Sequence, residues 1–137
     1  MKNLSTVQLA PKPVVYIVDK PGATQSVVRA GHVATPPNTP HEIAIQATND
    51  EMGDTFGSRL NMNLREEKHW AYGAGSFLFG AREQRPFIAL APEQTDKTKE
   101  SMAEVNKELR GILAERMVTA EELARIQANE TPAAGVA

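Results

Sequence analysis

The apolar pattern of this 137-residue sequence changes its period at Trp70, and that change constrains the fold more than any other feature. Over residues 39–66 apolar side chains recur at helical spacing, which predicts two helices separated near Gly53. Residues 70–80 are rich in glycine and aromatic residues and have no helical stripe, so we expect a long strand there. A second strand over 86–92 would complete a hairpin with it.

Two further strands are expected before the first helix. Residues 14–18 are β-branched or aromatic, and an extended pattern resumes over residues 25–33. Between them Pro21 and Gly22 predict a tight turn, because proline fixes φ and glycine accepts a positive φ. Consecutive prolines then end the second strand, since proline joins neither a helix interior nor a central ladder.

Capping boxes predict where two helices begin. Thr39 and Glu42 flank Pro40, a residue favoured at the first helical position, and Thr119 and Glu122 repeat the spacing. A long amphipathic helix is expected over 96–116. The helical side chains expected to face the core are Ile43, Ala44, Ala47, Met52, Phe56, Leu60, Asn63, Leu64, Met102, Val105, Leu109, Ile112, Leu113, Leu123 and Ile126. Those expected to face solvent on the long helix are Lys97, Lys99, Glu100, Lys107 and Glu108.

The expected order of elements is β-β-α-α-β-β-α-α. Strand hairpins that alternate with helix pairs predict an α+β fold, a two-layer sandwich with a mostly antiparallel sheet and helices packed on one face. The length allows one domain, which we place at residues 14–130. Residues 1–13 are interpreted as a lead-in strap and residues 131–137 as a flexible tail.

Composition and missing motifs exclude several classes of function. A net charge of −2 without a local Lys/Arg cluster argues against binding to nucleic acid, and no apolar run is long enough for membrane insertion. The absence of cysteine removes disulfides and thiol chemistry. The three histidines of the chain form neither a His-Glu-x-x-His nor a His-x-x-Glu-His zinc motif, and the sequence contains no phosphate-binding loop or nucleophile elbow. We therefore expect no metal site, no cofactor and no self-sufficient catalytic centre in this chain.

One segment points further. Residues 56–73 read Phe-Gly-Ser-Arg-Leu-Asn-Met-Asn-Leu-Arg-Glu-Glu-Lys-His-Trp-Ala-Tyr-Gly. This helix followed by an aromatic strand resembles the pitrilysin-like (insulinase-type) zinc metallopeptidases, relatives of the mitochondrial processing peptidase and of the bc1 core subunits. Residues 16–26, 95–98 and 119–123 match the same family, so the resemblance covers residues 13–130.

The resemblance implies a role beside a second domain. In that family one domain holds zinc and a homologous, zinc-free domain supplies an arginine and a tyrosine seven residues apart that reach the peptide substrate. Arg65 and Tyr72 have this spacing. Without the resemblance they read as a solvated helix-end cation and a packed strand residue. With it, we expect an inactive domain that assists hydrolysis of peptides by a zinc-bearing partner domain or subunit of a bacterial protein. The alternative is a non-catalytic assembly module like the bc1 core subunits.

Some positions depart from the family. His69 stands where relatives often have glycine, and Gly53-Asp54 replaces a two-glycine stretch. A positive φ at position 69 would therefore be less well tolerated here. The family's domain also continues beyond the last helix, so we expect a fragment. For the parent protein the bacterial periplasm or cell envelope is favoured, with the cytoplasm as the alternative.

Overall fold

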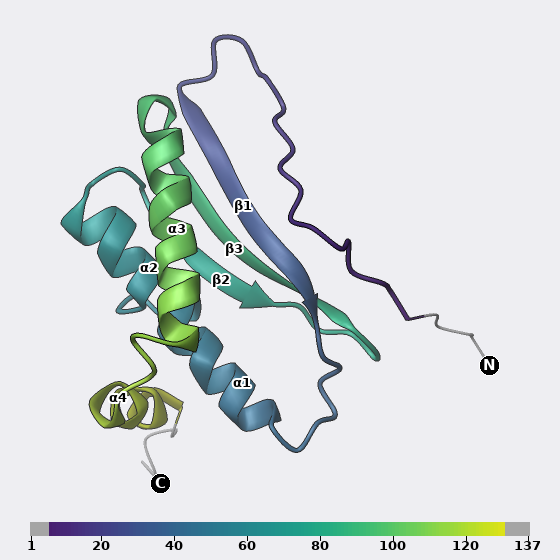
Figure 1. Ribbon diagram of the computed structural model, residues 1–137. Coiled ribbons are helices and arrows are strands. Elements are labelled where there is room, and N and C mark those ends of the chain that lie inside the picture. Colours follow the sequence, from purple (N-terminus) through teal and green to yellow (C-terminus); the bar gives the residue numbers. More distant parts are fainter. Residues whose placement is uncertain (1–5, 131–137) are drawn as a thin grey trace, which may run out of the picture.

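The computed structural model describes residues 6–130 and contains one sheet with helices against it (Figure 1). The first helix, Glu42–Asn49, continues into a π-helical turn, Asp50–Asp54, and the second helix, Arg59–Asn61, continues into another, Met62–Glu67. A 3-10 turn, Thr95–Lys97, precedes the third helix, Thr98–Leu113. None of the helices in this part of the chain has the length and apolar character needed to cross a bilayer. The elements are β1 (Gln25–Ala34), α1 (Glu42–Asn49), α2 (Arg59–Asn61), β2 (Gly75–Leu78), β3 (Arg85–Gln94), α3 (Thr98–Leu113) and α4 (Ala120–Glu130).

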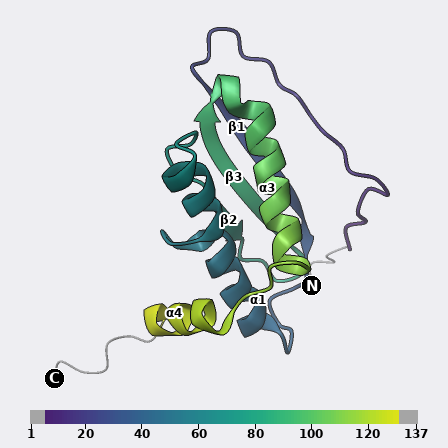
Figure 2. The ribbon, with the colours of Figure 1, turned by 60° about the vertical axis from the view of Figure 1, so that its left-hand side comes forward.

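The sheet is antiparallel with the strand order β1-β3-β2. Because side chains alternate along a strand, Ala89 and Ala91 of β3 and Val28 of β1 share one face. That face packs against Val105 of α3 in the main hydrophobic cluster. Figure 2 shows α3 lying along the sheet on this side. The predicted α+β class with an antiparallel sheet is confirmed.

The order of elements differs from the prediction at its first strand. Residues 14–18 form no strand, and Tyr16, Ile17 and Val18 are 85%, 89% and 90% exposed. A strand needs a hydrogen-bonded neighbour, and among residues 6–130 no other strand pairs with this apolar segment. The turn after it was predicted correctly: Gly22 has φ +78°, and the amide of Ala23 donates to the carbonyl of Lys20 at 3.1 Å.

The hairpin of β2 and β3 was predicted, but β2 is shorter than the expected strand over 70–80. Only an isolated bridge between Ala71 and Glu93 precedes it. Close backbone approach, suggested by the glycines, is found at Gly75: a Cβ there would lie 2.7 Å from the carbonyl oxygen of Gly53. A Cβ on Gly53 would lie 2.0 Å from the amide nitrogen of Ser76. Both glycines are therefore needed for the first π-helical turn to lie against β2.

The first capping box is wrong. Helix α1 begins at Glu42, with His41 at the N-cap position and no side-chain cap bond. The Glu42 carboxylate instead accepts two hydrogen bonds from the buried guanidinium of Arg85, at 2.8 and 2.6 Å, because a charge-assisted pair outcompetes a neutral cap. The expected buried face is also wrong here, since Ile43 is 83% exposed and Ala44 is exposed. Met52, further on, is buried as expected.

The long helix was predicted, and its buried stripe was predicted in part. Val105 is 3% exposed, and Leu109 and Ile112 pack against the cluster as expected. Met102 and Leu113 are instead 42% and 81% exposed. Glu108, expected in solvent, is 3% exposed because it accepts hydrogen bonds from Asn63 at 2.6 Å and from Arg116 at 2.5 Å. A buried carboxylate with such partners is stable where an unpaired one would not be.

The second capping box is confirmed at the start of α4. The Thr119 amide donates to Glu122 Oε2 at 2.8 Å, and the Glu122 amide donates to Thr119 Oγ1 at 3.2 Å. Ile126 is buried as predicted, whereas Leu123 is 40% exposed. Residues 6–13 of the expected strap are irregular and exposed, and the expected tail at 131–137 lies outside the described residues.

Candidate functional site

The helix that runs from Arg59 to Glu67 carries the first candidate residue. Ser58, at the N-cap position, has extended backbone, and after a single turn the helix widens into π-helical Met62–Glu67. Leu60 and Leu64 are 1% and 0% exposed and anchor the helix in the core. Arg65 follows directly, so it is presented by a firmly packed element. Short π-helical turns are frequent at functional sites.

A left-handed turn at His69 reverses the chain between the two candidate residues. The φ angle of His69 is +55°, the conformation that the comparison with relatives raised for this position. Its amide donates to the Arg65 carbonyl at 3.2 Å, while the amides of Trp70 and Ala71 donate to the Leu64 carbonyl at 3.0 and 3.2 Å. These bonds satisfy carbonyls at the helix C-terminus. They also fix the path from Arg65 to the strand.

Arg65 lies at the surface with its guanidinium over the ring of Phe56. The Cζ atom is 5.0 Å from the ring centroid, within the range of a cation–π interaction. The Nε atom is 3.3 Å from Glu66 Oε1, and the side chain is 41% exposed. Its terminal Nη groups make no hydrogen bond within residues 6–130, so they can donate to a ligand.

Tyr72 lies between the turn at His69 and the start of β2 at Gly75. It follows Ala71, whose bridge to Glu93 fixes the backbone, and its side chain is 87% exposed. Its hydroxyl has no hydrogen-bond partner in the described part of the chain. Tyr72 is therefore exposed and not a packed strand residue. Whether Arg65 and Tyr72 contact a substrate stays a prediction.

An open groove of about 350 Å³ is lined by neighbours of both residues. Phe56, which carries the Arg65 guanidinium, forms part of its wall, and Gly73, next to Tyr72, forms another part. The floor comes from the face of β3 that α3 does not cover. The lining residues are Gly53, Asp54, Thr55, Phe56, Asn61, Gly73, Ala74, Gly75, Phe77, Leu90 and Pro92. Most are apolar or glycine, which suits a side chain or an extended backbone.

Two residues of this region were missed from the sequence. Phe56 was expected in the core, yet it is 65% exposed because the helix starts only at Arg59 and leaves it in the preceding loop. Asn61 is 5% exposed, and its amide nitrogen donates to the Phe56 carbonyl at 2.7 Å. Its Oδ1 lies 3.4 Å from the amide of Ala74. Asn61 thus ties the two walls of the groove together, a contact that residue spacing does not signal.

An ionic cluster fixes the other end of this helix to α4. Arg59 Nη2 lies 2.8 Å from Glu122 Oε2, and Arg125 Nη2 lies 2.5 Å from Glu51 Oε2. Burial raises the pKa of Glu122, but hydrogen bonds from Arg59 and Thr119 outweigh it and lower the pKa to about 2. For Glu51, burial dominates and raises the pKa despite the bond from Arg125.

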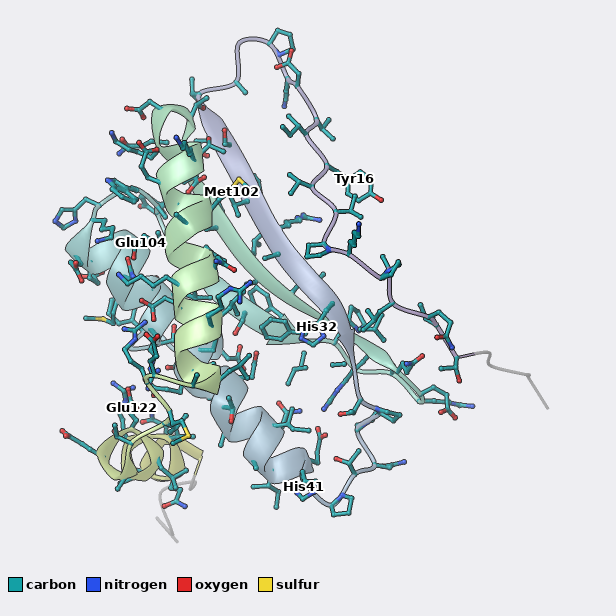
Figure 3. All side chains as sticks on the ribbon, viewed as in Figure 1. Tyr16, His32, His41, Met102, Glu104 and Glu122 are labelled. Atoms are coloured by element: carbon teal, nitrogen blue, oxygen red, sulfur yellow. The ribbon has the colours of Figure 1, made fainter. Side chains whose placement is uncertain are left out.

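Histidine and carboxylate side chains do not gather into a metal site in the described residues. No group of three or more His, Asp or Glu between residues 6 and 130 is arranged to hold an ion. Figure 3 shows His32 on β1 and His41 before α1, on separate elements, and His69 lies in the turn described above. The residues present therefore do not fit a zinc ion.

Comparison with known proteins identifies relatives of this arrangement. The sequence profile of the family described as the peptidase M16 inactive domain matches residues 3–130. No curated protein matches the sequence. Among solved structures, a peptidase M16 inactive domain from Pseudomonas fluorescens superposes with a TM-score of 0.76 at 19% identity, over 82% of this chain and 27% of that one.

Two other solved structures share the fold. A protease from Helicobacter pylori matches with a TM-score of 0.70 at 22% identity, over 80% of this chain and 27% of that chain. The periplasmic protease PqqL from Escherichia coli matches with a TM-score of 0.65 at 22% identity, over 79% of this chain and 12% of that chain. The chain thus spans about a quarter or less of each of these structures.

Proposed function

This chain belongs to the family of peptidase M16 inactive domains, and we propose that it holds a peptide and supports its hydrolysis by a zinc-bearing partner domain or subunit. The metal-dependent steps belong to that partner, because the residues described here offer no zinc site. The contribution of this chain is to bind the peptide and to donate hydrogen bonds near the reacting carbonyl.

The observation that carries the proposal is the exposure of Arg65 and Tyr72 on either side of one rigid turn. A guanidinium is always charged and offers several donors in a planar fork, and a phenol adds one more. Aimed at a scissile carbonyl, such donors stabilise the negative charge that develops on its oxygen in the transition state. Arg65 has unengaged Nη donors, and the Tyr72 side chain is 87% exposed. Both are therefore free to make these contacts.

An exposed apolar surface supports the proposal of a partner. Val27 on β1 and Phe77 on β2 point away from the core and are 56% and 40% exposed, and Phe79, just after β2, is 48% exposed. Rows of apolar side chains on an open sheet face are typical of surfaces that another protein covers. We assign this face to the zinc-bearing domain, which would bring its bound peptide to the groove that Phe77 also lines.

The test uses the parent protein, with both domains present, and an Arg65→Lys substitution. Lysine keeps the charge but cannot reproduce the fork of donors, so kcat/KM for peptide cleavage should fall roughly tenfold or more. Arg110→Lys is the matched control, because Arg110 lies on α3 and, within residues 6–130, bonds only to Asn106 nearby. Equal rates for both variants would leave Arg65 with a structural role. A parent without peptidase activity would favour the assembly module.

A further inference from the structure

Phe56 contacts Arg65 and also lines the groove. One side of its ring carries the Arg65 guanidinium, 5.0 Å from Cζ to the centroid, and the ring also lines the groove. It does both while 65% exposed, so the rest of the ring is accessible to a ligand. Asn61 holds the Phe56 backbone through a 2.7 Å bond to its carbonyl, so the ring is presented from a fixed point.

We propose that Phe56 positions Arg65 and forms one wall of a pocket for an apolar side chain of the bound peptide. The inference rests on the proposed function and adds to it the class of peptide that is preferred. A peptide whose apolar side chain fills the groove would press on the ring that holds the guanidinium. Substrate selection and Arg65 placement would then depend on the same residue.

The groove has the size and lining for such a side chain. Its volume of about 350 Å³ is more than twice that of an apolar cavity of about 150 Å³ that accommodates benzene. Phe77, Leu90 and Pro92 line the groove together with Phe56 and make its surface largely apolar. At Gly73 the place of a Cβ has only Asn61 Oδ1 near it, at 3.9 Å, which leaves room for the backbone of the peptide to approach. Asp54 is the one charged residue in the lining, and it disfavours an acidic side chain there.

The cation–π contact with Phe56 is one of two side-chain contacts that hold the Arg65 guanidinium. The other ionic contact, from Nε to Glu66 Oε1 at 3.3 Å, joins side chains that are 41% and 40% exposed. Exposed pairs of this kind contribute little because solvent screens them. Loss of the Phe56 ring should therefore release the guanidinium, whereas loss of the groove contacts alone should not.

The role of Phe56 in positioning Arg65 is tested by NMR on the full chain, which requires no partner domain. The heteronuclear NOE of Arg65 Nε reports motion of the guanidinium. It should fall in Phe56→Leu, which stays apolar but has no ring face, and should recover in Phe56→Trp. Arg110 Nε, bonded to Asn106 at 3.1 Å, is the internal reference and should not change. An Arg65 NOE that is the same in the parent chain and in Phe56→Leu would overturn the positioning role.

The pocket for an apolar side chain is tested by titrating the same chain with acetyl-Ala-Leu-Ala-amide and acetyl-Ala-Asp-Ala-amide. The leucine peptide should shift the amides of Gly73 and Gly75 and bind about tenfold more tightly than the aspartate peptide. Equal affinities, or no shift at these glycines, would overturn the pocket. Neither readout depends on cleavage, so a parent protein that fails the Arg65→Lys test refutes the hydrolytic role and leaves these results standing.

Discussion

Leu64 offers the sharpest test of how the candidate site is supported. It is 0% exposed and immediately precedes Arg65, so its packing holds the helix that presents the guanidinium. Replacement by alanine removes three buried carbons, which costs roughly 2.4 kcal/mol at about 0.8 kcal/mol each. The Leu64 carbonyl accepts from Trp70 and Ala71, so the backbone cannot move to fill the space. With the cavity term added, Leu64→Ala should lose about 3–5 kcal/mol of unfolding free energy.

Urea unfolding followed by fluorescence measures this loss, because Trp70 is the only tryptophan and packs against the same cluster. The midpoint should fall while the slope m stays constant, since the surface exposed on unfolding barely changes. Ile43→Ala is the control: this side chain is 83% exposed and should lose no more than about 0.5 kcal/mol. A loss below about 1 kcal/mol for Leu64→Ala, or a larger one for Ile43→Ala, would refute the packing described here.

Two further predictions concern acid stability and the turn. The folded pKa of Glu122 is about 2 against an ordinary 4.5, so its contribution is complete above 4.5 and is lost as the pH falls from 4.5 toward 2. Glu122→Gln should therefore lower stability at about pH 6 and flatten the acid decline, measured by urea unfolding at each pH; an unchanged decline would contradict the pairing with Arg59. His69→Gly should raise stability by about 0.5 kcal/mol, because a left-handed non-glycine residue costs roughly 1–2 kcal/mol and glycine loses part of that gain as chain entropy. A clear loss in thermal unfolding would mean that the bonds of His69 outweigh its strain.

Local signals predicted the parts of the fold that local physics determines. The turn at Pro21-Gly22 and the capping box of Thr119 and Glu122 depend on residues a few positions apart, and both are present. The capping box at Thr39 depends on the same chemistry, yet it fails because Arg85, far along the chain, binds Glu42. Spacing cannot reveal such a competitor. The same holds for Glu108, which is buried through Asn63 and Arg116.

The strand expected at residues 14–18 shows that β-propensity alone does not predict a strand. Its β-branched residues suit a pleated, half-buried surface, but propensity supplies no neighbouring strand. In the described residues this apolar segment stays exposed beside the sheet. Strand pairing is a property of the assembled sheet, and a sequence pattern alone does not determine it.

The candidate site was predicted in part. The resemblance gave Arg65 and Tyr72 and raised the strained turn at His69, where φ is +55°. It did not give Phe56, because helical periodicity assigned that residue to the core stripe. The helix begins only at Arg59, which leaves Phe56 in the preceding loop. Only the folded arrangement brings the Phe56 ring under the Arg65 guanidinium.

The most direct test of the central claim is the rate of peptide cleavage by the parent protein carrying Tyr72→Phe. The change removes one exposed hydroxyl and keeps the ring, so folding stability should not move. If the Tyr72 hydroxyl stabilises the transition state, kcat should fall roughly 10²–10³-fold with little change in KM. Tyr16→Phe, at the other tyrosine of the chain, is the control; Tyr16 is 85% exposed on the N-terminal segment (Figure 3) and should have no effect. Cleavage by Tyr72→Phe at the parent rate would contradict a role of this domain in transition-state stabilisation.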